Sequence, residues 1–212
     1  MMRRISPNHD RLQSLNGTWR DINGMPSLVS IPGDEQTAAH LGIADLSFLT
    51  RFGVKGAAAA VWLEGQDIDL PDRANTWRSL SNGGIIARLG LTEFLIEDSL
   101  HSSFALRLAE ACQSVPAKVY PVLRQDAAIV LCGTAIQDLL QQTCSVNFQA
   151  LFLDEHPVIL TLMVGVSVTV IPISPDRYRI WCDGTFGGYL WETLVTIAQE
   201  LGGGVVGADR LI

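Results

Sequence analysis

Apolar residues recur at helical spacing in two stretches of the chain. In the later stretch, apolar residues at i, i+4, i+7, i+8 and i+11 predict one buried face of a helix over residues 186–201. An earlier stripe predicts a helix within residues 100–113. Thr185 is the expected N-cap of the later helix, and Ser102 or Ser103 that of the earlier one. The two stripes consist of Phe104, Leu108, Ala111 and Cys112, and of Leu190, Leu194, Ile197, Ala198 and Leu201.

Each helix follows a pair of strand-like segments joined by a short turn. Residues 84–90 and 93–98 form the first pair, and residues 168–174 and 177–183 form the second. The turns contain Gly-Leu-Thr and Ser-Pro-Asp, which are typical turn residues. The pattern therefore predicts two β-hairpins, each followed by a helix.

The part that precedes each hairpin is also similar in the two halves. Residues 51–63 read RFGVKGAAAAVWL and residues 127–140 read AAIVLCGTAIQDLL; aligning Gly56 with Gly133 also aligns Leu63 with Leu140. Each segment predicts a strand, a glycine turn and a short helix. The sequence thus predicts two copies of a β-α-β-β-α unit, at about 41–115 and 122–205, with chance similarity between two ordinary α/β stretches as the alternative.

The remaining segments are less regular. Residues 1–40 are polar, contain several Gly and Pro residues and show only a weak strand signal at 27–31, so we expect them to wrap over the repeats. Residues 118–123, near Pro116, are the expected junction between the copies. Residues 157–173 carry no charge, but their Val, Ile and Thr content and their alternation favour two buried strands over a membrane span.

Composition limits the class of protein. The chain of 212 residues is 48% hydrophobic and only 17% charged, which indicates a globular fold with a large core. A net charge of −7 argues against a nucleic-acid partner. The low charge favours a protein partner, either a larger subunit or a second copy, over a monomer with a surface rich in Ser, Thr and Gln. The N-terminal arginines precede no apolar segment, so we expect no secretory signal and a cytoplasmic location, with no membrane association.

Most common catalytic and metal motifs are absent from the sequence. The four cysteines contain no C-x-x-C pair, so we expect buried thiols and no metal site. The four histidines are scattered and suggest no catalytic triad. The glycine pairs match neither a dinucleotide-binding nor a P-loop pattern.

Two regions resemble a known superfamily. HLGIADLSFLTRFGVKGAAAAVWL, residues 40–63, is similar to the opening of glycine-cleavage T-proteins, in which an acidic residue and a serine precede a strand, a glycine and an alanine-rich helix. The second copy resembles the sarcosine oxidase gamma subunit, through DAAIVLCGTAIQDLL, the loop at 144–148 and RYRIWCDGTFGGYLWETL. The resemblance spans about residues 35–210. It implies an α+β fold of tandem β-α-β-β-α units, like the folate-binding domain of aminomethyltransferases, that lacks the C-terminal barrel-like domain of T-proteins.

The resemblance also implies candidate catalytic residues. T-proteins place their catalytic aspartate after the first alanine-rich helix, where this chain reads EGQDIDLPDRANTW. Asp67 or Asp69 would therefore stabilise a developing iminium ion or accept a proton from a folate nitrogen. The alternative is a solvated acidic loop whose Asp residues cap turns.

Ligand-binding residues are implied in the same way. Arg73, Asn75, Arg78 and Arg88 would contact the anionic glutamate tail of a folate, or they are surface or interface arginines. T-proteins hold the pterin ring with the carboxylate of a Gly-Tyr-Thr-Gly-Glu segment. The matching place here reads ISPDRY, with Asp176 as a displaced acid.

These departures shape the functional hypotheses. The leading one is an accessory, non-catalytic subunit similar to the sarcosine oxidase gamma subunit, docked on a larger partner. The alternative is a tetrahydrofolate-binding aminomethyltransferase-like enzyme, with tetrahydrofolate as the only candidate cofactor. A folate-dependent regulatory protein is a third hypothesis, but the Lys-Gly-Cys-Tyr-x-Gly-Gln-Glu type of signature expected for it is absent from the sequence.

Overall fold

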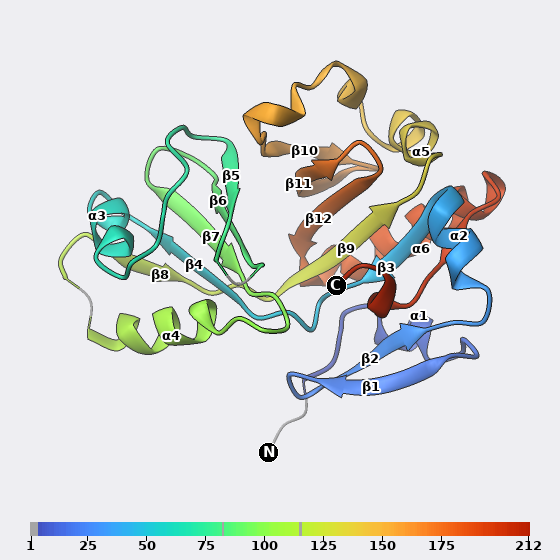
Figure 1. Ribbon diagram of the computed structural model, residues 1–212, viewed down its shortest axis with the longest axis horizontal. Helices are drawn as coiled ribbons and strands as arrows, with labels where there is room; N and C mark the ends of the chain where they lie inside the picture. Colours follow the sequence, from blue (N-terminus) through green and yellow to red (C-terminus); the bar gives the residue numbers. More distant parts are fainter. Residues whose placement is uncertain (1–3, 82, 115) are drawn as a thin grey trace. The chain divides into compact units, whose positions relative to one another are not determined.

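The computed structural model describes residues 4–81, 83–114 and 116–212 and divides the chain into two compact units (Figure 1). The first unit combines Met1–Phe48, Asp126–Leu153 and Ile159–Ile212. The second unit combines Leu49–Gln125 with the short segment Asp154–Val158. Each unit has its own main sheet and its own core; the sheet of the second unit is antiparallel, and that of the first is antiparallel except for the parallel pair β13 and β3.

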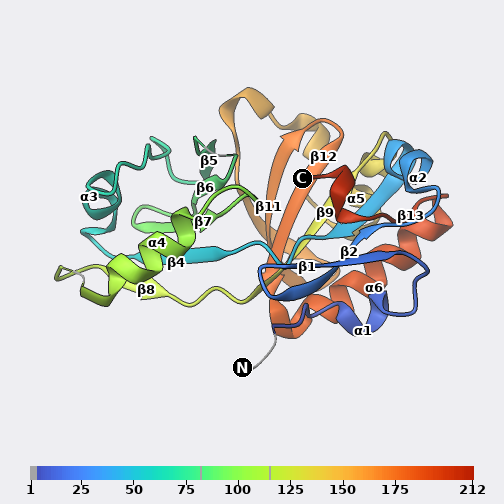
Figure 2. The same ribbon diagram turned by 60° about the horizontal axis from the view of Figure 1, so that its bottom comes forward.

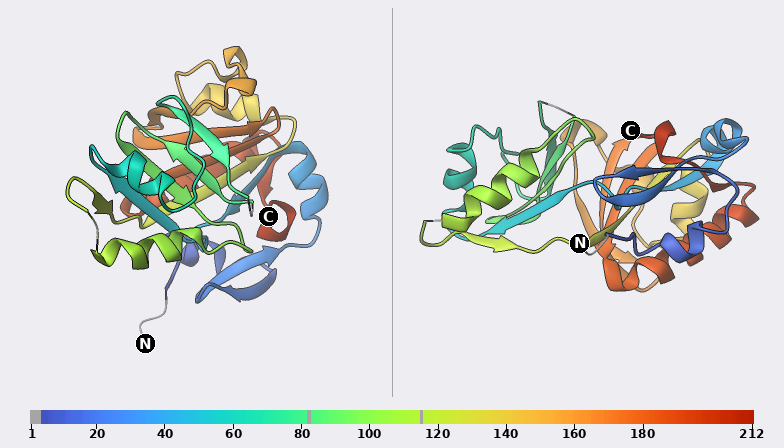
Figure 3. Two further views of the ribbon diagram at one scale, coloured as in Figure 1. Left: turned by 60° about the vertical axis from the view of Figure 1, so that its left-hand side comes forward. Right: turned by 90° about the horizontal axis from the view of Figure 1, so that it is seen from below.

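The second unit contains a five-stranded sheet in the order β5-β6-β7-β4-β8, with all neighbours antiparallel. Its two α-helices cover one face, where Leu63 and Leu108 pack with Val54, Phe94 and Ile96 (Figure 3). The elements are β4 (Arg51–Lys55), α3 (Ala59–Glu64), β5 (Thr76–Ser79), β6 (Ile85–Arg88), β7 (Glu93–Glu97), α4 (Phe104–Ala111), η1 (Cys112–Ser114) and β8 (Tyr120–Val122).

The first unit contains a six-stranded sheet in the order β10-β11-β12-β9-β3-β13. Helices α5 and α6 cover one face, where Leu139 and Leu194 pack with Ile129, Leu131 and Ile180 (Figure 2). The elements are β3 (Gly42–Asp45), β9 (Asp126–Cys132), α5 (Ile136–Thr143), η2 (Phe148–Ala150), η3 (Leu153–Glu155, at the boundary with the second unit), β10 (Ile159–Met163), β11 (Val166–Ser174), β12 (Arg177–Asp183), α6 (Gly184–Glu200), β13 (Gly204–Val205) and η4 (Ala208–Arg210).

The N-terminal segment belongs to the first unit. It forms α1 (His9–Leu12), a hairpin of β1 (Thr18–Ile22) and β2 (Met25–Ser30), and α2 (Asp34–Leu41). The hairpin is longer than the weak strand signal at 27–31 indicates, because the turn at Asn23 and Gly24, both with positive φ, returns the chain onto itself. Leu12 and Leu28 join the core of the unit.

The two sheets repeat the same order and confirm the duplicated α+β fold. Each copy runs β-α-β-β-β-α and so has one more strand, β5 or β10, than the hairpin pattern predicts. The predicted hairpins are β6–β7 and β11–β12. The strand that precedes each copy pairs in the sheet of the other copy: β3 lies beside β9, and β8 lies beside β4.

The turn between the first strand and first helix is alike in both copies, down to individual hydrogen bonds. The Gly56 N–H donates to the Thr92 carbonyl over 3.0 Å, and the Gly133 N–H donates to the Asp176 carbonyl over 3.0 Å. Gly56 and Gly133 have φ of 124° and 109°, which favour glycine strongly. The alignment of Gly56 with Gly133 thus identifies structurally equivalent positions.

An aspartate supplies the side-chain bond at the start of the second helix of each copy. Asp183 is the N-cap of α6, and its Oδ1 accepts the N–H of Thr185 over 2.8 Å and the Thr185 hydroxyl over 2.6 Å. In α4, Ser103 occupies the N-cap position, as expected, but its side chain makes no capping bond, and Asp98 accepts the N–H of Ala105 over 3.0 Å instead. The predicted Thr185 cap is therefore wrong by two positions, because Thr185 donates to the cap residue instead.

Replacing Asp183 by alanine is expected to lower the free energy of unfolding by about 1 kcal/mol, the usual cost of a lost N-cap. The hydrogen bonds from Thr185 also lower the pKa of Asp183, which indicates that the ionised form accepts them. Urea denaturation of Asp183→Ala, with Asp183→Asn as a variant that still accepts, measures the cost. Equal losses in the two variants would contradict the capping role.

No helix among the described residues is long and apolar enough to cross a membrane. The uncharged stretch at 157–173 forms β10 and most of β11, two strands as predicted. The prediction that both are buried is wrong for β10, an edge strand whose Leu160 and Leu162 are exposed.

Candidate functional site

The predicted catalytic aspartates lie in the loop that follows α3, in the second unit. Asp67 is exposed and has a positive φ of 60°, and its N–H donates to the Glu64 carbonyl over 3.0 Å. The carboxylate of Asp69 is exposed and forms an ion pair with Arg78 of β5. Arg78 also lies 3.8 Å from Asp72. The loop is thus an acidic, solvated segment tied to β5 by one arginine.

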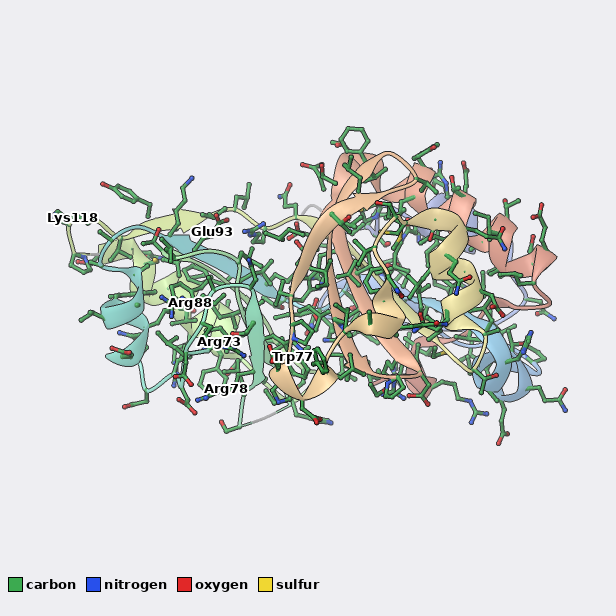
Figure 4. All side chains as sticks on the ribbon, turned by 90° about the horizontal axis from the view of Figure 1, so that it is seen from above. Arg73, Trp77, Arg78, Arg88, Glu93 and Lys118 are labelled. Atoms are coloured by element: carbon green, nitrogen blue, oxygen red, sulfur yellow. The ribbon has the colours of Figure 1, made fainter. Side chains whose placement is uncertain are left out.

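The predicted ligand-binding residues of this loop mostly contact the protein itself (Figure 4). Arg73 is exposed and lies 3.4 Å from Glu155. Asn75 has a φ of 58°, its N–H donates to the Arg88 carbonyl over 2.7 Å, and its carbonyl accepts the N–H of Val158 over 2.8 Å. The adjacent Trp77 is buried and stacks edge-on against His156, with ring centroids 5.0 Å apart.

Arg88, the last residue of β6, holds the same loop through hydrogen bonds. Its Nη1 donates to the carbonyls of Pro71 and Asp72 over 3.1 Å and 3.0 Å, and its Nη2 donates to the Leu91 carbonyl over 3.0 Å. The guanidinium also lies 5.4 Å from the ring centroid of Phe94. Three of its donor bonds therefore hold backbone in place.

Asp176 lies in the first unit, at the turn between β11 and β12. Its carboxylate accepts the Ser174 hydroxyl over 2.6 Å. The residue lines a cavity of about 230 Å³ together with Glu35, Cys132, Arg177 and Arg210. Asp176 is thus a predicted site residue that lines a cavity of the first unit.

Beside this cavity, Asp34 anchors the C-terminal segment to α2. Its carboxylate lies 3.1 Å from Arg210 and also accepts the N–H groups of Ile31 and Gly207, over 3.0 Å and 3.4 Å. Burial by itself raises the pKa of this carboxyl. The bonds from Ile31, Arg210 and Gly207 outweigh burial, and the net pKa lies below the ordinary value.

This lowered pKa predicts a pH dependence of stability. A carboxyl whose pKa is lower in the folded state stabilises the fold above its unfolded pKa, near 4, and the contribution disappears as pH falls through the folded pKa. The difference in unfolding free energy between the wild type and Asp34→Asn should therefore be largest near neutral pH and shrink below about pH 4. Denaturation curves at pH 7, 5 and 3 measure it, and a constant difference would contradict the assignment.

A half-buried carboxylate that sequence reasoning missed lies at the end of β3. Asp45 accepts hydrogen bonds from the hydroxyls of Ser6 and Ser47, both over 2.5 Å, and from the side-chain amide of Asn8 over 3.2 Å. Burial raises the pKa of Asp45, although these donors act in the opposite direction. The Ser47 hydroxyl in turn accepts the N–H of Ala128 over 3.0 Å. This network ties the N-terminal segment to the sheet; the Asp-Leu-Ser spacing is its only local signal.

Metal ligands do not gather in either unit. Among residues 4–81, 83–114 and 116–212, no group of three His, Cys, Asp or Glu side chains is placed to hold a metal ion. All four cysteines are buried and unpaired as disulfides. Burial raises the pKa of the Cys182 thiol to about 12, with Asp126 and Asp183 adding to the shift, so this thiol stays protonated.

Comparison with solved structures confirms the fold. The glycine cleavage aminomethyltransferase T from Bartonella henselae matches 99% of this chain with a TM-score of 0.75 and 15% identity. This chain spans 61% of that T-protein chain. A chain of the heterotetrameric sarcosine oxidase from Corynebacterium sp. U-96, solved in complex with pyrrole 2-carboxylate, matches over 98% of this chain and 100% of its own length, with a TM-score of 0.69 and 17% identity.

These similarities define the fold class: the chain has the α+β fold seen in the T-protein and in the matched sarcosine oxidase chain. The motifs at 40–63 and in the second copy indicate the same fold. No family model matches the sequence. A comparison with curated proteins finds no match either.

Proposed function

We propose that the chain is an accessory, non-catalytic subunit, similar to the sarcosine oxidase gamma subunit, of a larger enzyme in amine or one-carbon metabolism. The observation that carries the proposal is the match to one whole chain of a heterotetrameric sarcosine oxidase, which covers 98% of this chain and 100% of the other. A subunit of such an assembly has part of its surface covered by its partners, so its surface needs less charge than that of a free monomer. The charged content of 17% agrees with this role.

The local geometry of the second unit supports a structural role for its arginines. Arg88 donates three hydrogen bonds to backbone carbonyls, and Arg78 forms ion pairs with Asp69 and Asp72. An arginine engaged in this way has few donors left for the glutamate tail of a folate.

The alternative proposal is a tetrahydrofolate-binding enzyme or regulator, and the T-protein match favours it. Asp67 is the best candidate for its catalytic acid, because its carboxylate is exposed and has no hydrogen-bond or ion-pair partner among the described residues. This proposal keeps the predicted catalytic role of Asp69 and the predicted ligand-binding roles of Arg73, Asn75, Arg88 and Asp176.

Purification of the tagged chain from its own host, at native expression level, separates the two proposals. An accessory subunit should elute as part of a larger assembly of fixed stoichiometry, and that assembly should consume oxygen when sarcosine or another secondary amine is added. The mass comes from light scattering and the activity from an oxygen electrode. A chain that elutes alone or only as a homo-oligomer, without amine oxidation, would contradict the accessory role.

A thermal-shift titration with 5-formyl-tetrahydrofolate tests the alternative on the isolated chain. A ligand present at a thousand times its Kd stabilises the folded state by about 4 kcal/mol, which gives a clear upward shift in Tm. Under the accessory proposal we expect no shift up to millimolar folate. If a shift occurs, Asp67→Asn and Asp69→Asn should reduce it if these residues bind folate, whereas Asp138→Asn, an exposed carboxylate on α5, should leave it unchanged.

A further inference from the structure

The cavity of the first unit has a balanced set of charges on its wall. It has a volume of about 230 Å³ and lies among α2, the end of β9, the start of β12 and the C-terminal η4. Its charged lining residues are Glu35, Asp176, Arg177 and Arg210. The lining thus contains two cations and two anions, and its formal charge sums to zero.

These four charged residues differ in the ion pairs and hydrogen bonds that they form. Arg210 lies 3.1 Å from Asp34 and 3.5 Å from Glu35, so its guanidinium is already paired. Arg177 is half-buried and, in the described part of the chain, has neither an ion pair nor a hydrogen bond from its side chain. A guanidinium that is partly removed from water and left unpaired is costly, so its N–H groups are strong donors for a ligand anion.

The preceding residue in the sequence supplies a carboxylate. Asp176 precedes Arg177 at the start of β12, and its carboxylate accepts one hydroxyl, from Ser174, which leaves most of its acceptor capacity open. Both charges also act on the Cys132 thiol. Arg177 lowers and Asp176 raises the pKa of the Cys132 thiol, which burial raises most, and Cys132 also lines the cavity.

The size and charge of the cavity restrict the ligand. Pockets for drug-sized ligands measure roughly 300–1,000 Å³, so a cavity of about 230 Å³ suits a smaller molecule. A phosphate dianion would face two carboxylates beside its arginine, and an amine cation would face two arginines. A molecule that carries one charge of each sign satisfies Arg177 and Asp176 together.

We propose that this cavity binds a small zwitterionic amino acid, whose carboxylate pairs with Arg177 and whose ammonium group pairs with Asp176. The proposal is independent of the accessory role, since it rests on the first unit alone and on no partner. It would give the chain a ligand site in addition to its assembly surface.

Binding of alanine, propionate and ethylamine to the purified chain tests the proposal. Propionate is alanine without its ammonium group, and ethylamine is alanine without its carboxylate. Titration followed by amide chemical shifts should show alanine binding with a Kd of about 1 mM, an ordinary affinity for so small a ligand. Propionate and ethylamine should each bind roughly tenfold more weakly, because one charged hydrogen bond is lost.

Variants at the two charges identify the site. Arg177→Gln and Asp176→Asn should each weaken alanine binding roughly tenfold or more. Arg107→Gln, at an exposed arginine of the second unit, should not change it. Circular dichroism and Tm check that each variant is folded. The proposal is overturned if alanine does not bind at 50 times the expected Kd, if propionate binds as tightly as alanine, or if Arg177→Gln and Arg107→Gln have the same effect.

Discussion

Gly133→Ala is expected to destabilise the protein by about 3 kcal/mol or more, because two separate penalties act at this position. The residue has a φ of 109°, which a side chain makes strained. A Cβ placed there would lie 2.4 Å from the carbonyl oxygen of His40 and 2.5 Å from its carbonyl carbon. These are backbone atoms, so no side-chain rotation relieves the clash.

The neighbouring hydrogen bonds keep that carbonyl in place. The Ala135 N–H donates to the His40 carbonyl over 2.9 Å, and the Thr134 N–H donates to the Ala39 carbonyl over 3.1 Å. Any shift that relieves the clash would therefore break the contact between the start of α5 and the end of α2. Urea denaturation of Gly133→Ala measures the loss in unfolding free energy.

Gly165→Ala is the matched control in the same unit. Gly165 also has a positive φ, 85°, but no atom lies within 4 Å of the position that a Cβ would take. Its substitution should therefore cost only the backbone term, about 1–2 kcal/mol. Equal losses at Gly133 and Gly165 would show that the close approach to His40 contributes nothing.

The parts of the fold that were predictable are those with local signals. The Gly56 and Gly133 turns, the β6–β7 and β11–β12 hairpins and the apolar face of α6 all depend on residues close together in the sequence. The placement of β3 and β8, each in the sheet of the other copy, was not predictable. β3 pairs with β9, and β8 with β4, so their register depends on partners in the other half of the chain. Neither strand carries a distinctive pattern of its own.

The extra strands were missed for a related reason. β5 reads TWRS and is too short to show a clear alternation. β10 lies within the uncharged stretch at 157–173, where the sequence predicts two strands but does not assign the first of them to the repeat. Edge strands of this kind are defined by the neighbour that they pair with.

The candidate site was predictable only in part. The acidic and arginine-rich loop at 64–77 was identified, but its internal bonds, such as the three from Arg88 to backbone carbonyls, depend on how the loop folds back on β6. The Asp45 network was invisible because Ser6 and Asn8 are 39 and 37 residues away in the sequence. Asp176 was identified through the resemblance, whereas Arg177 beside it gave no signal until the cavity was seen.

The buried ion pair between Arg51 and Glu97 is expected to give the second large effect. The two residues are register partners on β4 and β7, with Nε and Oε2 2.6 Å apart and side chains only 2% and 0% exposed. Removing either charge takes the ion-pair partner away from the other, which stays buried. Arg51→Met or Glu97→Met should therefore each lower the unfolding free energy by about 3–5 kcal/mol.

A double-mutant cycle distinguishes the loss of the ion pair from the loss of packing. The variant with Arg51→Met and Glu97→Met removes both charges and fills the space with apolar side chains, so it should be more stable than either single variant, because no unpaired charge remains. The exposed pair of Arg73 and Glu155, 3.4 Å apart, is the control and should show a coupling below about 1 kcal/mol. Additive losses at Arg51 and Glu97 would contradict the ion-pair account, since independent side chains show no coupling.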